Sequence, residues 1–174
     1  VGALVVLAAV AATVTFGLRY ENLRAQEQSR VSALEAAERY VVTMFGFNPE
    51  NIEENIRKTM AVVTGDAKKE FEDRVLGGDD VNGTALATAV KEQGVVSQVE
   101  IQAAGVVENT RDTAKVLLFI NQSASAASLE EVSANPSRVI YAMKRESGTW
   151  KITDIELVTD ETLQHLLDPD AEQA

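Results

Sequence analysis

Cysteine is absent from this chain of 174 residues, and histidine occurs once. The absence of cysteine excludes disulfides, thiolate nucleophiles and cysteine-ligated zinc, and a single histidine excludes a multi-histidine metal site. Basic residues are also scarce, because 16 lysines and arginines stand against 27 aspartates and glutamates, for a net charge of −11. This balance argues against a nucleic-acid partner, since binding to phosphates depends on lysine and arginine. With 45% hydrophobic residues the chain can bury a core, so the composition indicates a folded acidic protein with little catalytic equipment.

The longest stretch without charge lies at the start of the chain. Residues 1–18 contain no charged residue and are rich in valine, leucine and alanine. At about 1.5 Å per residue a helix of this length rises roughly 27 Å, close to the hydrocarbon thickness of a bilayer. A signal-peptide core is shorter, at about 7–15 residues. We therefore predict a transmembrane helix over 1–18. Its small residues would allow close packing against other spans; they are Ala8, Ala9, Ala11, Ala12 and Gly17.

Helical spacing dominates the part of the chain that follows the span. Apolar residues recur mostly three and four apart from Tyr20 to Phe47, and a polar run over 24–30 interrupts them. We interpret 19–31 as a solvated helical stalk between membrane and domain. Ser32 is a candidate helix cap and domain start, although one helix running through it also fits the pattern. Further helical segments follow an Asn-Pro-Glu restart, and the last of them ends at a glycine.

The period of the apolar residues then changes from about 3.6 to 2, which is typical of strands. Residues 95–103 alternate, and residues 116–120 are apolar at every position, which predicts a central strand covered on both faces. Residues 123–136 predict a long loop of small residues, or a segment that is partly strand. A hairpin over 138–157 completes the pattern. A shift of its apolar positions predicts a bulge or bend near Asp154.

Helices followed by an antiparallel sheet make an α+β domain. We predict about three helices packed on a sheet of about four strands, as expected for this order of segments. The predicted organisation is a transmembrane helix over 1–18, a stalk over 19–31, the α+β domain over 32–160 and an acidic tail over 161–174. The tail contains one apolar segment, 163–167.

Several short segments carry a resemblance to a known family when they are taken in order. They are the span, the helix 33–47, Thr64-Gly65-Asp66 with Phe71, and the stretches 104–107, 114–123 and 148–152. Together they resemble the Mce-associated membrane proteins of mycobacteria and related actinobacteria, over nearly the whole chain. The sequence departs from the family at Thr149, where arginine is expected, and at Ala67, where an aromatic residue is common.

The resemblance implies a cone-shaped domain of the nuclear-transport-factor-2 superfamily, with helices on a curved antiparallel sheet. It implies as partners the Mce proteins with their permease and ATPase, which import fatty acids or sterols. It also implies a non-enzymatic, stabilising subunit, anchored by one span in the cytoplasmic membrane with its domain on the extracytoplasmic side. No active site is attributed to the family.

Two other functions stay open. One is a scaffold subunit of another envelope machine, such as a type IV secretion assembly, and the other is a stand-alone carrier or enzyme for an apolar ligand. For the carrier, a set of aromatic residues would line a cavity in the cone; the same set would otherwise fill the core. The set is Tyr40, Phe45, Phe47, Phe71, Phe119, Tyr141 and Trp150.

The titratable residues select no catalytic, cofactor or metal site. His165 lies in the acidic tail without an evident orienting partner. The segment 78–83 resembles part of a calcium loop, but the first and last ligand positions fall on glycine and alanine. Tyr40 or Tyr141 with Asp154 would imitate the tyrosine and carboxylate of an isomerase, although nothing in the spacing selects that pair.

Overall fold

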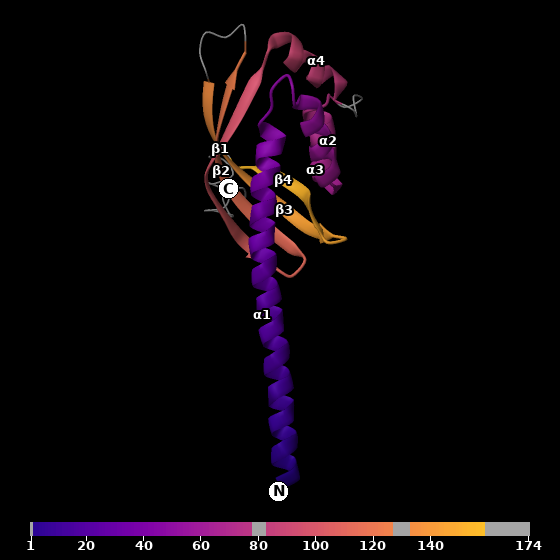
Figure 1. Ribbon diagram of the computed structural model, residues 1–174, viewed down its shortest axis with the longest axis vertical. Helices are drawn as coiled ribbons and strands as arrows, with labels where there is room; N and C mark the ends of the chain where they lie inside the picture. The colour runs from indigo at the N-terminus through magenta and orange to yellow at the C-terminus, as the bar shows by residue number, and fades with distance from the viewer. Residues whose placement is uncertain (1, 78–82, 127–132, 159–174) are drawn as a thin grey trace, which may run out of the picture.

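The computed structural model describes residues 2–77, 83–126 and 133–158, and it describes the side chains of the first helix from Glu21 onward. Helices and strands follow one another as predicted for an α+β domain (Figure 1). The elements are α1 (Gly2–Phe45), α2 (Ile52–Val62), α3 (Gly65–Arg74), α4 (Thr84–Gln93), β1 (Val96–Asn109), β2 (Thr113–Ser125), β3 (Ser133–Glu146) and β4 (Thr149–Leu157).

Helix α1 is continuous, and its N-terminal part projects from the domain as a single rod (Figure 1). Ser32 lies in the middle of this helix and caps nothing, because the helix runs through both predicted boundaries, 18/19 and 31/32. Within the predicted stalk, the Gln26 side-chain amide donates to the main-chain carbonyl oxygen of Asn109, and the Asn109 side-chain amide donates to the main-chain carbonyl oxygen of Gln26. In the part of the chain whose side chains are described, no helix is long and apolar enough to cross a membrane. The side chains of the predicted span lie outside that part.

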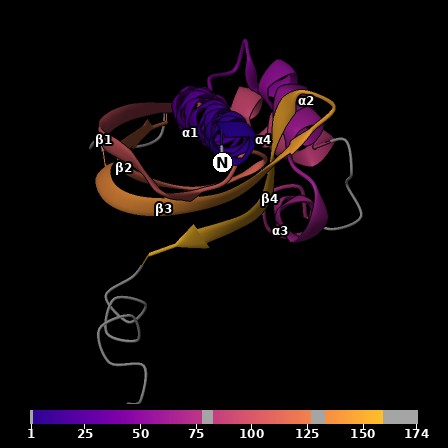
Figure 2. The ribbon, with the colours of Figure 1, turned by 90° about the horizontal axis from the view of Figure 1, so that it is seen from below.

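Small side chains bring α1 close to the sheet. Its buried face consists of residues three and four apart, as the 3.6 period requires; they are Ser29, Ala33, Ala36, Ala37 and Val41. Alanine and serine keep the helix backbone near the strands. Figure 2, viewed along the helix, shows the sheet curving around one side of α1.

The sheet has the order β1-β2-β3-β4 and every neighbouring pair is antiparallel. Its inner face, toward α1, carries Val116, Leu118, Tyr141 and Ile152, all fully buried. No helix among the described residues covers the opposite face, and Phe119 there is 40% exposed. The prediction that 116–120 is covered on both faces was therefore wrong. An apolar run alone does not say how many layers pack on a strand.

The segment 123–136 is strand at both of its described ends. Strand β2 continues to Ser125 and β3 begins at Ser133, with Pro136 directly opposite Asn121. The predicted loop is therefore shorter than 123–136, and the partly strand alternative is correct. Small polar residues carry little strand pattern of their own, so pairing with the neighbouring strand decides their conformation.

The predicted irregularity at Asp154 is confirmed as a β-bulge. Asp154 pairs with Ala142 and Ile152 pairs with Met143, so Thr153 is an extra residue on β4. The bulge changes which side chains share a face. Beyond it, Ile155 lies opposite the buried Tyr141, so β4 keeps its apolar residues on the inner face.

The buried side chains form two clusters, one between α1 and the sheet and one among α2, α3 and α4. Helices α2 to α4 gather beside the C-terminal end of α1 (Figure 1). Met44, near that end, packs against both clusters. The second cluster consists of Ile52, Ile56, Phe71, Leu76, Ala87 and Val90.

Candidate functional site

A broad groove crosses the outer face of the sheet, opposite α1. The antiparallel register aligns Ala103, Phe119 and Arg138 across three strands, and the next row aligns Leu117 with Ile140. The groove has a volume of about 1240 Å³. We call it the outer groove. It is lined by Glu100, Gln102, Phe119, Ile120, Asn121, Pro136, Ser137, Arg138, Leu157 and Val158.

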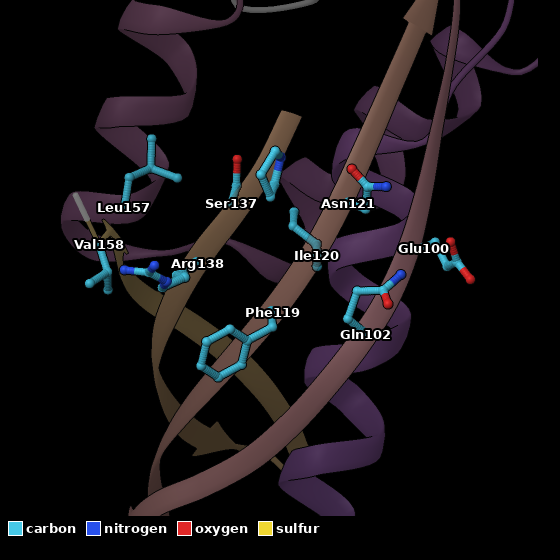
Figure 3. A pocket seen from close by; sticks show the side chains of 10 residues that line it. Glu100, Gln102, Phe119, Ile120, Asn121, Ser137, Arg138, Leu157 and Val158 are labelled. Carbon is cyan, nitrogen blue, oxygen red and sulfur yellow. The ribbon is translucent and has the colours of Figure 1, made fainter. Parts of the chain in front are cut away.

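Phe119 is a large, solvent-exposed apolar side chain of the outer groove. Figure 3 shows its ring between the side chains of Arg138 and Gln102, with the amide of Asn121 farther along β2. An aromatic ring and an arginine within a polar rim are typical of protein-protein interfaces. Among the described lining residues, Glu100 supplies one carboxylate and Arg138 supplies one guanidinium.

A second, smaller concavity lies where the two buried clusters meet. It has a volume of about 280 Å³ and lies between the end of α1, α3, α4 and the end of β4. We call it the apolar groove, because most of the described residues that line it are apolar. It is lined by Met44, Phe45, Phe47, Glu70, Phe71, Val75, Leu86, Ile155 and Leu157.

The seven aromatic residues named from the sequence do not line one common cavity. Tyr141 and Trp150 belong to the cluster under α1, with Tyr40 packed against it, whereas Phe71 belongs to the other cluster. Phe45, Phe47 and Phe71 line the apolar groove, and Phe119 lines the outer groove. The spacing of these residues in the sequence did not show which of them would share a cavity. Their placement depends on which face of β2 packs against α1.

The two candidate tyrosines make contacts that differ from those of an isomerase pair. The Tyr40 hydroxyl donates to the carbonyl oxygen of Trp150 at 2.8 Å. The Tyr141 hydroxyl lies 3.6 Å from the sulfur of Met44. Burial raises the pKa of both hydroxyls above the ordinary tyrosine value. Asp154 is exposed and aligns with Ala142 on the outer face, so the structure does not bring this carboxylate to either hydroxyl.

The other titratable candidates supply no metal site. His165 and most of the segment 78–83 lie outside the described residues. Within 2–77, 83–126 and 133–158, no group of three or more histidine, cysteine, aspartate or glutamate side chains is arranged to hold a metal ion. The small residues of the predicted span also have undescribed side chains, so their packing stays a prediction.

No family model matches the chain, and comparison with known sequences gives two distant matches. Two proteins of Mycobacterium tuberculosis, the uncharacterized proteins Rv1362c and MT1407, are each 22% identical over 154 residues. The alignment covers 86% of this chain and 67% of theirs.

Comparison of structures gives similar domains, among them one from a type IV secretion system protein. The VirB8 protein of Agrobacterium tumefaciens aligns with a TM-score of 0.58 at 9% identity, over 76% of this chain and 94% of that one. An IcmL-like type IV secretion system protein of Legionella pneumophila gives 0.55 at 10% identity, over 74% and 91%. The periplasmic domain of DotI gives 0.54 at 15% identity, over 72% and 92%.

The fold is that of these VirB8-like domains. The predicted α+β architecture, with helices on a curved antiparallel sheet in the manner of nuclear transport factor 2, is confirmed. At such identities the likeness establishes the fold alone. It does not establish membership of the Mce-associated family.

Proposed function

We propose that this protein is a non-enzymatic scaffold subunit of a cell-envelope machine, held to the cytoplasmic membrane by the predicted span 1–18, with its domain on the extracytoplasmic side. The observation that carries the proposal is the uncovered outer face of the sheet. Helix α1 lies on the inner face and α2 to α4 gather beside its C-terminal end, while Phe119 is exposed in the outer groove. A partner protein that covers this face would supply the missing layer.

Phe119 and its neighbours would supply the apolar surface for such a contact. Burial of apolar surface contributes about 25 cal/mol per Å², and aromatic and arginine side chains at the centre of an interface carry much of the binding energy. Phe119 is 40% exposed, with Leu117 and Ile140 in the next row and Arg138 beside it. This arrangement supports a role in binding a protein.

The similar structures support the class of machine. VirB8, the IcmL-like protein and DotI share this fold, and the IcmL-like protein is a component of a type IV secretion system. A domain of this kind on a single span therefore suits the assembly of a large membrane complex. We therefore favour the function of a scaffold subunit.

A second candidate is a stabilising subunit of an Mce-type lipid importer. It is favoured by the alignment with mycobacterial proteins over 86% of the chain and by the ordered segments that resemble the Mce-associated family. The partners would then be the Mce proteins with their permease and ATPase. The fold is the same for both candidates, so only the partners distinguish them.

The test is purification of the tagged protein from its native membrane in a mild detergent, followed by mass spectrometry of what remains bound. Recovery of secretion-system components supports the first candidate, and recovery of Mce subunits with their permease and ATPase supports the second. Recovery of the protein alone with bound lipid contradicts both and favours a stand-alone carrier.

The Phe119→Asp variant tests whether the outer groove is the contact surface. We expect recovery of the partners to fall at least about tenfold, the change that a loss of about 1.4 kcal/mol produces. Val31→Asp is the matched control, because Val31 is also exposed but lies on α1, away from the outer groove. Equal recovery with both variants would show that the partners bind elsewhere.

A further inference from the structure

Two hairpin turns lie side by side at the end of the sheet from which α1 projects (Figure 1). One joins β1 to β2 and the other joins β3 to β4. The main-chain N–H of Arg145 donates to the carbonyl oxygen of Asp112 at 2.7 Å, which ties the two turns together. We call residues 110–112 and 144–148 the basic turns. They lie at the end of the sheet that faces the predicted span (Figure 1).

The continuous helix α1 sets the height of the basic turns above the membrane. Ser29 donates to the carbonyl oxygen of Arg111, and Gln26 is bonded to Asn109. With the predicted span ending at residue 18, a rise of about 1.5 Å per residue places Gln26 roughly 12 Å and Ser29 roughly 16 Å above the hydrocarbon. The headgroup layer fills about 5–8 Å of that height. The turns therefore lie within about one Debye length, about 8–10 Å, of the headgroups.

The charge of the basic turns has the opposite sign to that of the whole chain. They contain three basic residues and two acidic ones, Asp112 and Glu146, whereas the chain has 16 basic and 27 acidic residues. The side chains of Arg111, Lys144 and Arg145 are all exposed. Clusters of lysine and arginine close to a bilayer are attracted to anionic lipid headgroups, so this end of an acidic protein suits a membrane surface.

Exposed apolar side chains occur at the same end of the domain. Leu23 is 66% exposed and lies on α1, three residues before Gln26. Val107 is 59% exposed and lies on β1, two residues before Asn109. Large apolar side chains are costly to leave in water, and together with basic residues they are typical of segments that lie in a membrane interface. Burial and charge therefore point independently to the same surface.

We propose that the basic turns rest on the bilayer surface, where Arg111, Lys144 and Arg145 bind the phosphates of anionic phospholipids. The inference rests on the proposed function, because the span 1–18 has to bring the domain to the membrane. The turns would then be a second point of attachment beside α1. Two points of attachment fix the tilt of the domain, so the outer groove is presented to partners in one direction.

The test measures how closely the basic turns approach the headgroups. Because the chain contains no cysteine, Ser147→Cys in the full chain accepts a single fluorescent dye at an exposed position of the turns. The labelled protein is placed in nanodiscs whose headgroups carry a nitroxide, a short-range quencher. One set contains phosphatidylcholine alone, and the other contains equal parts of phosphatidylglycerol and phosphatidylcholine. Glu50→Cys is the control position, because it is exposed and lies beyond the far end of α1.

We expect quenching at position 147 to be at least about twofold stronger in the anionic nanodiscs, and this gain to vanish at about 1 M salt, where the Debye length is about 3 Å. Quenching at position 50 should not depend on the lipid. Equal quenching at position 147 in the two lipids would overturn the proposal.

Substitutions then test the three basic side chains. Replacing Arg111, Lys144 and Arg145 with glutamine should abolish the gain, whereas Arg111→Lys with Arg145→Lys should retain it, because the charge is kept. The matched control makes the same change of charge at exposed positions of α1, α2 and α3, with Arg39→Gln, Arg57→Gln and Lys69→Gln. An equal loss with the control triple would mean that the total charge acts and not these turns.

Two further outcomes also overturn the proposal, and they separate it from the proposed function. Release of the turns by inorganic phosphate at constant ionic strength would indicate a site for free phosphate instead of a lipid contact. Failure of the unaltered protein to enter nanodiscs of either lipid would contradict the anchor, and this inference with it. Entry into both lipids with equal quenching would overturn the headgroup contact alone and leave the scaffold function to the test with native membranes.

Discussion

Trp150 shows at the scale of single residues how α1 is held to the far strand of the sheet. Its indole Nε1–H donates to the Ser32 hydroxyl at 3.0 Å, and its carbonyl oxygen accepts from the Tyr40 hydroxyl at 2.8 Å. Both partners lie on α1, about two turns apart. Buried polar groups need such partners, so each bond fixes the register between the helix and β4.

Tyr141 gives a prediction about alkaline pH. Burial raises the pKa of this fully buried phenol well above the ordinary value, and the sulfur of Met44 is a weak acceptor that does little for its hydrogen. Between the unfolded pKa of about 10 and the higher folded pKa, only the folded chain keeps the proton. The free energy of unfolding should therefore be unaffected by this group below pH 10 and fall above it, by about 1.4 kcal/mol per pH unit.

The measurement is urea unfolding of the unaltered protein and of Tyr141→Phe between pH 7 and 11. At pH 7 the two should agree within about 1 kcal/mol, because phenylalanine fills the same space. Above pH 10 the variant should lose stability more slowly. Parallel pH profiles for the two proteins would show that the pKa of Tyr141 is the same in the folded and the unfolded chain.

At the scale of elements, the fit of α1 on the sheet depends on the small size of its buried residues. Ala37 is fully buried, and a leucine there would push the helix away from the strands or force strained rotamers. We expect Ala37→Leu to lower the free energy of unfolding by about 1–3 kcal/mol, measured with urea. Glu35→Leu, at an exposed position of the same helix, should change it by less than about 0.5 kcal/mol. Equal effects of the two substitutions would mean that the helix tolerates bulk on its inner face.

The elements that the sequence predicted well are those in which the apolar pattern and the packing agree. Alternation identified the strands, and the displaced pattern after Ile152 located the bulge at Thr153 and Asp154. The pattern failed where side chains are small, since the strand ends at Ser125 and Ser133 depend on pairing rather than on composition.

The candidate site was harder to predict than the fold, and Phe119 shows why. It belongs to an unbroken apolar run, so its spacing is the same whether one face of β2 or both are covered. Only the placement of α1 on the face of Leu118 leaves Phe119 in solvent. Exposure of this kind is a property of the layers and not of the local sequence.

At the scale of the whole molecule, α1 joins the predicted membrane span to the domain without a break. Ser29 on this helix donates to the carbonyl oxygen of Arg111 at 2.5 Å, and Gln26 is bonded to Asn109. Both contacts reach the turn between β1 and β2, which therefore braces the helix below the buried clusters. A helix that is braced in this way would transmit the orientation of the span to the outer groove.

The small face of the predicted span provides the test of that connection. If Ala8 and Ala12 allow close contact with other spans, replacing both with leucine should reduce recovery of the complex without altering unfolding of the domain, whose buried residues on α1 begin at Ser29 among the described side chains. Val6→Leu with Val10→Leu is the matched control, because it adds bulk at the same spacing while Ala8 and Ala12 stay small. Recovery is measured by the same mass spectrometry as for Phe119→Asp. Loss with the alanine pair alone would place an interface in the membrane, whereas loss with Phe119→Asp alone would confine recognition to the outer groove.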